Sequence, residues 1–485
     1  GPAARGRAPS RASRSPVTPI APVPRSAWLA LGVATLAALF TVIDVSIVNV
    51  AFPSIRRELG ASEAGLSWVL SGYSVAIGAF LLIAGRLADR KGRRRTFMVG
   101  VVVFIVGSLG SGIAPAVGWL IAARVVQGIG ASILSPASLS MILPLFPPDR
   151  RSMVIGVWGA SASLGAALGP SAGAILLDLL SWRWVFLVNV PIGALILALA
   201  PRYVTESLDP DAEGGFDLVG VPAGTLGITL LLVAVVQGGE WGYGSATTVV
   251  VAVVGVALLG LLVTRSATHP APLLDLSLFR LRSFWSASAG QFFFTTAFIA
   301  VILFNTLLLQ EWWQWSPLSA GFGVVAGPVL AAIISGPIGS IADRFGHRRL
   351  LVIGCLATAG NPTWLWIRAE AEPNYVVTVL PALLMLGVGV ACSFATFASL
   401  GLRDVPQTRF ATASATLRTT STLGFAVGVA IAVAVYSAAV HLGPVVAYRR
   451  TWAFMAITLF VGAAFCHMFC PPRSPATVET QNPPA

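Results

Sequence analysis

A succession of long apolar stretches constrains this fold more than any other feature of the sequence. An apolar helix needs about 20 residues to cross the hydrocarbon of a bilayer, and by that measure the sequence predicts fourteen crossings. Only 10% of the residues are charged and 56% are apolar, whereas about a quarter of a soluble globular protein is charged. We therefore expect an all-α polytopic membrane protein, with spans at 28–53, 64–85, 96–114, 119–143, 152–177, 184–201, 217–237, 246–265, 284–309, 317–341, 349–367, 375–400, 409–436 and 451–470.

The distribution of basic residues predicts the orientation. Placing the N-terminus in the cytoplasm puts 23 of the 31 Lys and Arg residues in cytoplasmic segments and 6 in outer loops, leaving Arg124 and Arg418 within the membrane. Lys and Arg favour the cytoplasmic side, so both termini are expected to be cytoplasmic. The net charge of +12 does not indicate a nucleic-acid partner, because the basic residues lie in short separated loops and form no continuous face.

One charged sequence occurs twice. Residues 85–95 read GRLADRKGRRR and residues 339–349 read GSIADRFGHRR, which agree at seven of eleven positions without a gap. Both copies fall in predicted cytoplasmic loops, and eight spans separate them. An even number of spans between repeats indicates two parallel halves. The expected architecture is two six-helix bundles with two inserted helices between them.

This plan divides the chain into five segments. A basic tail rich in Pro, Ser, Ala and Arg, expected to be disordered, precedes the first bundle, and a short tail follows the second. Between the bundles lie an acidic linker, the two inserted helices and an interfacial linker. The boundaries are 1–27, 28–202, 203–283, 284–470 and 471–485.

Asp44 is the only acid that lies well within a predicted span. It is about nine residues from the outer end of the first span, and Arg124 is about six residues below the outer surface in the fourth, so their depths agree. Charge inside a bilayer is costly and indicates function with a partner. Desolvation favours the neutral carboxyl and a nearby guanidinium favours the carboxylate. We expect Asp44 to couple protons with Arg124 as its partner; the alternatives are a fixed structural pair or a capped kink.

Glycine spacing in the fifth span predicts a flexible packing face. Gly165, Gly169 and Gly173 recur every four residues and share one helix face, and Pro170 is expected to bend the helix. We interpret these four residues as a hinge between conformations. Ordinary tight packing is the alternative, and the two readings are compatible.

The repeated motif is expected to act as a gate. Gly85 and Gly92 would permit a tight turn between spans, Asp89 could face a helix N-terminus, and the arginines could contact anionic headgroups. Arg and Gly are also common in any short membrane loop. The expected gating residues are Gly85, Asp89, Arg90, Gly92, Arg93, Arg94, Gly339, Asp343, Arg344 and Gly346.

Polar and aromatic residues within the spans are candidates for a substrate cavity. Together they fit a mostly apolar cavity with few polar groups, although each alone is typical of helix packing. Cys466, His467 and Cys470 lack a further ligand, so no metal site is expected. The cavity candidates are Asn49, Trp68, Tyr73, Trp158, Gln291, Phe294, Asn305, Phe394, Phe397 and Arg418.

These residues give the chain a resemblance to the major facilitator superfamily, and within it to the fourteen-span drug:proton antiporters of the multidrug and quaternary-ammonium resistance type. The resemblance covers roughly residues 28–470. Residues 85–94 match the family loop motif G-x-L-A-D-R-x-G-R-[RK]. The first-span motif L-D-x-T-[IV]-V-N-V-A-L-P is matched at Asp44, Val48, Asn49, Val50, Ala51 and Pro53. The motifs R-x-x-Q-G-x-G-A and G-x-x-x-G-P-x-x-G are matched at Arg124, Gln127, Gly128, Gly130, Ala131, Gly165, Gly169, Pro170 and Gly173.

The resemblance implies export by alternating access, driven by inward proton flow, with Asp44 and Arg124 in the coupling roles. The chain departs from some relatives because the last six spans contain no second acid, so a doubly charged substrate is not expected. Arg418 either balances Asp44 or meets an anionic group.

The expected function is proton-coupled antiport of lipophilic small molecules, such as drugs, antibiotics, dyes or natural products, across a bacterial-type inner (plasma) membrane. Its partners would be the substrate, protons and membrane lipids, with no cofactor and as a monomer. A lipid or lipid-precursor translocase on the same fold is the alternative. A membrane-embedded transferase is remote, because the four histidines are scattered and no nucleotide-binding loop occurs; no enzyme activity is expected.

Overall fold

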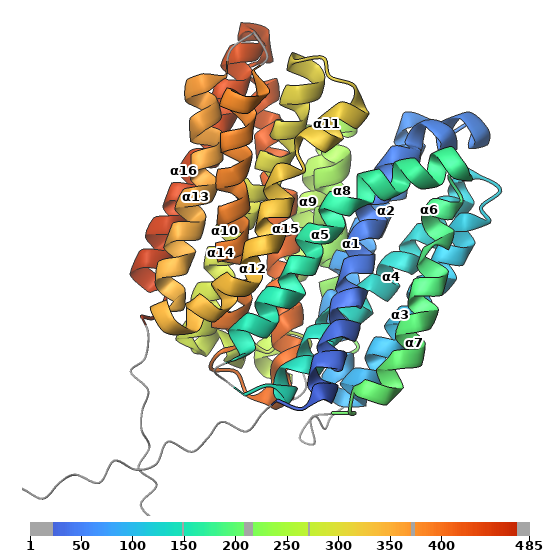
Figure 1. Ribbon diagram of the computed structural model, residues 1–485, viewed down its shortest axis with the longest axis vertical. Coiled ribbons are helices and arrows are strands. Elements are labelled where there is room, and N and C mark those ends of the chain that lie inside the picture. Colours follow the sequence, from blue (N-terminus) through green and yellow to red (C-terminus); the bar gives the residue numbers. More distant parts are fainter. Residues whose placement is uncertain (1–22, 148–149, 208–216, 270–271, 370–373, 473–485) are drawn as a thin grey trace, which may run out of the picture.

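The computed structural model describes residues 23–147, 150–207, 217–269, 272–369 and 374–472, except for several side chains within the helices. These residues form helices and no strands, so the predicted all-α architecture is confirmed. Figure 1 shows the helices of the first half, in blue to green, beside those of the second half, in yellow to red. Both ends of the described chain lie at the lower end of this view, as an even number of crossings requires.

The first half and the inserted pair follow the predicted spans. The sixth span of the first half is broken at Val188 into a short helix and a long helix. The helices are α1 (Arg25–Leu59), α2 (Glu63–Lys91), α3 (Arg93–Gly112), α4 (Val117–Ile142), α5 (Arg151–Leu179), α6 (Trp184–Leu187) and α7 (Asn189–Tyr203), followed by the inserted α8 (Gly220–Trp241) and α9 (Ala246–Thr268).

The second half repeats this plan. The tenth span of the chain, which is the second span of this half, is broken after Gly323. Its helices are α10 (Arg282–Leu307), α11 (Pro317–Gly323), α12 (Ala326–Phe345), α13 (His347–Arg368), α14 (Leu380–Leu402), α15 (Phe410–Ser437) and α16 (Pro444–Phe469). Within the described residues, thirteen helical segments are long and apolar enough to cross a membrane. The 29-residue α5 stands at the fifth predicted span but is not one of the thirteen, and several of its side chains are not described.

The repeated motif is mostly helical, which corrects the expectation that it forms a loop. α2 continues through Asp89 to Lys91, and the chain turns only at Gly92, whose φ of 100° favours glycine. Gly346 occupies the same place in the second copy, with φ 88°. The prediction that Gly85 contributes to the turn is wrong, because Gly85 lies inside α2.

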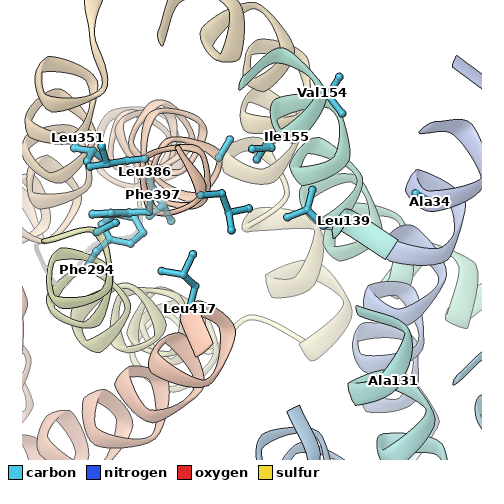
Figure 2. Packing of buried hydrophobic residues seen from close by; sticks show 14 of the residues in the cluster. Ala34, Ala131, Leu139, Val154, Ile155, Phe294, Leu351, Leu386, Phe397 and Leu417 are labelled. Atoms are coloured by element: carbon cyan, nitrogen blue, oxygen red, sulfur yellow. The ribbon is translucent and has the colours of Figure 1, made fainter. Parts of the chain in front are cut away.

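The two halves pack closely at the end that carries the motif. α5 of the first half packs against α12 and α14, while α2 and α4 pack against α15. A single hydrophobic cluster includes Ile155 of the first half with Phe397 and Leu417 of the second (Figure 2). The first half therefore meets the second directly, through apolar side chains rather than through the linkers alone.

Candidate functional site

Asp44 of α1 is bound to Arg124 of α4. The Nη1 atom of Arg124 donates to Oδ2 of Asp44 at 2.5 Å, and both side chains are 0% exposed. Unit charges about 4 Å apart attract by about 4 kcal/mol at an effective dielectric constant of about 20. Removing each ion from water costs several kcal/mol, so the pair needs additional hydrogen bonds to be stable as charges.

Two neutral amide side chains supply such hydrogen bonds to the carboxylate, and a serine hydroxyl holds both amides. Oδ1 of Asp44 accepts from Gln127 Nε2 at 2.7 Å and from Asn189 Nδ2 at 2.8 Å. Both amides also donate to the Ser108 hydroxyl at 3.0 Å, and Ser108 in turn donates to the carbonyl of Phe186. The buried carboxylate is thus held by α1, α3, α4 and α7 together, so its charge is sensitive to the arrangement of four helices.

Aromatic rings complete the environment of Arg124. The guanidinium carbon lies 4.2 Å from the centre of the Tyr73 ring and 5.6 Å from that of Phe186, a cation–π arrangement. Its Nε donates to the Val69 carbonyl at 3.2 Å. Gly128 lets α2 approach, since a Cβ there would lie 2.5 Å from the carbonyl oxygen of Tyr73. Within the described residues, Arg124 Nη2 and the Tyr73 hydroxyl are buried without a hydrogen-bond partner.

Arg418 does not balance Asp44. Its side chain, on α15, is exposed and close enough to Tyr73 for electrostatic interaction. No described carboxylate forms an ion pair with Arg418. The two carboxylate oxygens of Asp44 already accept hydrogen bonds from Arg124 and from the two amides. Arg418 is therefore a cation of the second half that faces the network of the first without joining it.

The first copy of the motif crosses from one half to the other. Asp89 accepts the backbone N–H groups of Ala411 and Thr412, at 3.2 and 2.7 Å, so it faces the N-terminus of α15. Arg93 donates to Asp89 at 2.9 and 3.1 Å and to the carbonyls of Gln407 and Thr408. Gly85 permits this contact, because a Cβ there would lie 2.8 Å from the carbonyl oxygen of Ala411.

The expectation that the arginines face anionic headgroups is wrong for Arg93. That residue is 2% exposed and is bound wholly within the protein. The adjacent turn is held by Glu206, whose carboxylate accepts the backbone N–H groups of Arg94 and Arg95 at 3.0 and 3.1 Å. Arg94 is half-buried and Arg95 is exposed, while Arg90 is half-buried and also has a contact partner.

The second copy makes the reciprocal contact. A Cβ on Gly339 would lie 2.5 Å from the carbonyl oxygen of Ser152 on α5, so the backbones of α12 and α5 touch. Ser399 shares hydrogen bonds with Ser152 at 2.6 Å and with His347 Nε2 at 2.9 Å. Since Ser152 belongs to the first half and the other two to the second, this group also links the halves. The side chains of Asp343 and Arg344 lie outside the described residues.

The glycines of α5 pack against α1, the helix that carries Asp44. A Cβ on Gly165 would lie 3.0 Å from the Leu39 carbonyl, one on Gly169 would overlap the side chain of Ser46, and one on Gly173 would lie 3.1 Å from the Ile47 carbonyl. The predicted close approach along one face is therefore present. The side chain of Pro170 is not described.

The predicted cavity residues do not gather in one place. Tyr73 joins the Asp44 network, and Trp158 donates from its indole to Ser138 at 3.2 Å. Phe294 and Phe397 are 0% exposed and pack with Phe394 in the core of the second half, so they line no cavity in this conformation (Figure 2).

The other predicted cavity residues are scattered as well. Trp68 is half-buried, and Gln291 and Asn305 are buried along α10, each with an unpaired amide atom among the described residues. The Asn49 side chain is not described.

Glu58 lies at the end of α1 that is far from the motif, and its carboxylate binds two side chains, Trp182 and Arg183. Trp182 donates from its indole to Glu58 at 2.6 Å, and Arg183 donates to the same carboxylate. These hydrogen bonds, from Arg183 first and then Trp182, lower the pKa of Glu58 below its ordinary value. Trp182 is only 2% exposed, so its indole is buried in the protein and binds a carboxylate.

Comparison with known proteins identifies the family. The model of the Major Facilitator Superfamily matches residues 34–428 and 285–484. The chain belongs to this superfamily. It is accordingly a membrane transporter rather than an enzyme, and a multi-pass protein of the bacterial plasma membrane.

Relatives of this transporter are bacterial resistance proteins. The multidrug resistance protein Stp of Mycobacterium tuberculosis is 35% identical over 408 residues, covering 82% of this chain and 74% of Stp. The puromycin resistance protein pur8 of Streptomyces alboniger is 32% identical over 480 residues, covering 95% and 94%. The multidrug efflux pump LfrA of Mycolicibacterium smegmatis is 32% identical over 416 residues, covering 86% and 82%.

Solved structures agree on the fold of this transporter. The human organic anion transporter MFSD10 superposes with a TM-score of 0.67 at 16% identity, covering 91% of this chain and all of that one. The proton:xylose symporter XylE superposes with a TM-score of 0.66 at 18% identity, covering 92% and 96%. At these identities the likeness concerns the fold alone, and it confirms the predicted major facilitator architecture.

Proposed function

We propose that this transporter exports lipophilic small molecules by proton-coupled alternating access, with Asp44 as the proton-carrying group. The observation that carries the proposal is the ion pair of Asp44 and Arg124, fully buried and tied by hydrogen bonds to four helices. The relatives Stp and pur8 are resistance proteins and LfrA is a multidrug efflux pump, which supports export as the direction and drugs as the cargo.

Proton coupling follows from the cost of breaking the pair. A proton on Asp44 removes the negative charge that holds Arg124, and a buried cation left without its partner costs roughly 3–5 kcal/mol. Gln127 and the Val69 carbonyl still accept from Arg124, but neither carries a charge. Protonation therefore favours a conformation in which this region is hydrated, and loss of the proton favours the sealed arrangement.

The glycine face of α5 gives α1 a path for that change. Small residues along one helix face allow a neighbouring helix to shift without large side-chain rearrangement. Ser46, two residues after Asp44, donates to the Gly165 carbonyl at 3.2 Å, so movement of the α1–α5 seam acts directly on the carboxylate. If the motif end faces the cytoplasm, as the basic residues predict, the arrangement described here is closed to the cytoplasm.

The substrate that fits best is a neutral, zwitterionic or singly charged amphipathic molecule. The described spans of the second half contain no buried acid that could bind a second positive charge. Arg418 instead offers an exposed cation near Tyr73. A dication would therefore meet repulsion at this position and no compensating carboxylate.

The test measures proton release on substrate binding. Purified protein in weakly buffered detergent receives puromycin or the dye ethidium, and a pH indicator reports released protons. Wild-type protein and Glu311→Gln, a change at an exposed carboxylate outside the network, are expected to release protons, whereas Asp44→Asn is expected to release none while still binding. Undiminished release from Asp44→Asn would refute the assignment. Vesicles that move a labelled phospholipid but no drug would favour the lipid translocase instead.

A further inference from the structure

A cavity of about 220 Å³ lies at the motif end of the first half, away from the Asp44 network. It is formed where α1 begins, where α3 begins and where α7 ends, with Ser26, Arg94 and Arg202 among its lining residues. Asp44 is 18 residues further along α1 than Ser26, or about 27 Å at 1.5 Å per residue. The cavity is therefore separate from the proposed coupling site.

The cavity is positive, with two arginines in its lining against the single carboxylate of Glu206 beside Arg94. It contains two guanidinium groups, and none of the described residues that line it is acidic. Arg202 is exposed, and the described residues provide it with no ion-pair or hydrogen-bond partner. Arg94 donates from Nη1 to the Val204 carbonyl at 3.2 Å, and its Nε lies 3.9 Å from Glu206, so the rest of its guanidinium stays available. Pro24, which precedes α1, offers no side-chain acceptor to the first N–H groups of that helix.

The position of the cavity matches the headgroup level of a membrane. α1 begins at its edge, and the next residues of this spanning helix, Trp28 and Leu29, are 41% and 42% exposed. An exposed indole followed by apolar surface is typical of the boundary between headgroups and hydrocarbon. A ligand in the cavity could therefore have its charged group between the arginines and its acyl chains alongside α1.

We propose that this cavity binds the phosphate group of an anionic phospholipid, with Arg94 and Arg202 as its guanidinium ligands. The planar fork of a guanidinium matches the geometry of phosphate oxygens, and basic pockets between spanning helices are suited to lipid headgroups. A soluble phosphate compound shares this chemistry. Because Arg94 lies in the motif, in the first turn of α3, and Arg202 precedes the linker between the halves, a bound phosphate would join these segments to the start of α1.

The experiment compares three ligands on the full chain purified in detergent. Thermal unfolding is followed while phosphatidylglycerol, diacylglycerol with the same acyl chains, or inorganic phosphate is added. Phosphatidylglycerol is expected to raise the unfolding midpoint by several degrees at saturation, and diacylglycerol is expected to leave it unchanged. Arg202→Gln and Arg94→Gln are each expected to weaken the apparent affinity for phosphatidylglycerol about tenfold or more.

Arg280→Gln serves as the matched control, because Arg280 is exposed but does not line the cavity; its affinity should equal that of the wild type. Midpoints without ligand show whether each variant is folded. Equal shifts with phosphatidylglycerol and diacylglycerol, or equal losses in Arg280→Gln and Arg202→Gln, would overturn the site. A shift given by inorganic phosphate alone, to which phosphatidylglycerol adds nothing, would overturn the lipid assignment in favour of a soluble phosphate compound.

Discussion

Replacement of Asp89 by Asn should weaken the contact between the two halves at the motif end. Asp89 receives two hydrogen bonds from Arg93 and two from the backbone at the start of α15. Asn has almost the same shape but only one acceptor oxygen. Its amide nitrogen would face a donor N–H, either of Arg93 or of Thr412, and the attraction between the carboxylate and the guanidinium would be lost.

The size of the effect can be worked out from these contacts. A hydrogen bond to a charged group contributes about 1.5–3 kcal/mol. Asn would lose the charge on all four bonds, and it would lose the acceptor for one bond or for three, because Oδ1 of Asp89 accepts three of them and Oδ2 accepts one. A net loss of about 3 kcal/mol corresponds to a change of more than a hundredfold in a conformational equilibrium. Alternative conformations of such proteins commonly lie within a few kcal/mol, so the variant is expected to populate the arrangement open at this end substantially.

The assay is the distance between spin labels on the two halves at the motif end. Lys91 and Arg280 are exposed there, on the first half and beside α10 respectively. The four native cysteines are buried, so cysteines introduced at these two positions can be labelled selectively. Wild-type protein should show mainly the shorter distance, and Asp89→Asn should add a longer one. An unchanged distance distribution in a folded variant would refute the idea that Asp89 holds this end closed.

Three further changes test other parts of the structure. Ser399→Ala removes hydrogen bonds to Ser152 and His347 and, at about 1 kcal/mol each, should lengthen the same label distance less than Asp89→Asn does. Gly169→Ala should lower the unfolding midpoint, since overpacking costs about 1–3 kcal/mol, and Ser46→Gly in the same protein should restore part of it; no restoration would mean that the overlap with Ser46 is not the cause. Because the pKa of Glu58 is lowered in the folded state, its contribution is present above the unfolded pKa and is lost as pH falls through the folded pKa. Glu58→Gln should thus lower the midpoint by about one or two degrees at pH 7, given its half-exposed carboxylate. A difference that does not shrink as the pH is lowered below the ordinary pKa of Glu would contradict this origin.

Much of the fold follows from hydropathy, because backbone polar groups in lipid must be satisfied within each helix. Span lengths and the parity between the repeated motifs are enough to predict the order of the helices and the two halves. Depth along the spans also predicted the meeting of Asp44 and Arg124. The same reasoning predicts the depth of a residue in the membrane but not the rotation of its helix about the axis. It therefore does not predict which side chains at the same depth contact each other.

The remaining members of the site depend on how each helix is rotated about its axis, which the sequence does not predict. Ser108 is an ordinary small polar residue in the third span, yet it accepts hydrogen bonds from both Gln127 and Asn189, and nothing in its sequence neighbourhood distinguishes it from Ser111. Phe294 and Phe397 were expected to face a cavity but face the core. An apolar helix that is buried or lipid-facing all round has no hydrophobic stripe from which its orientation could be read.

The repeated motif shows how a symmetric sequence can give unequal chemistry. Each copy reaches the opposite half, Gly85 against α15 and Gly339 against α5, so the sequence repeat does predict a structural one. The residue after the turn glycine that both copies share is Arg93 in the first copy and His347 in the second. Arg93 secures Asp89 with a permanent charge, whereas His347 binds Ser399 through a ring that can be neutral. The first contact therefore depends on an ion pair and the second on neutral hydrogen bonds, so the two could respond differently to the proton gradient that we propose drives transport.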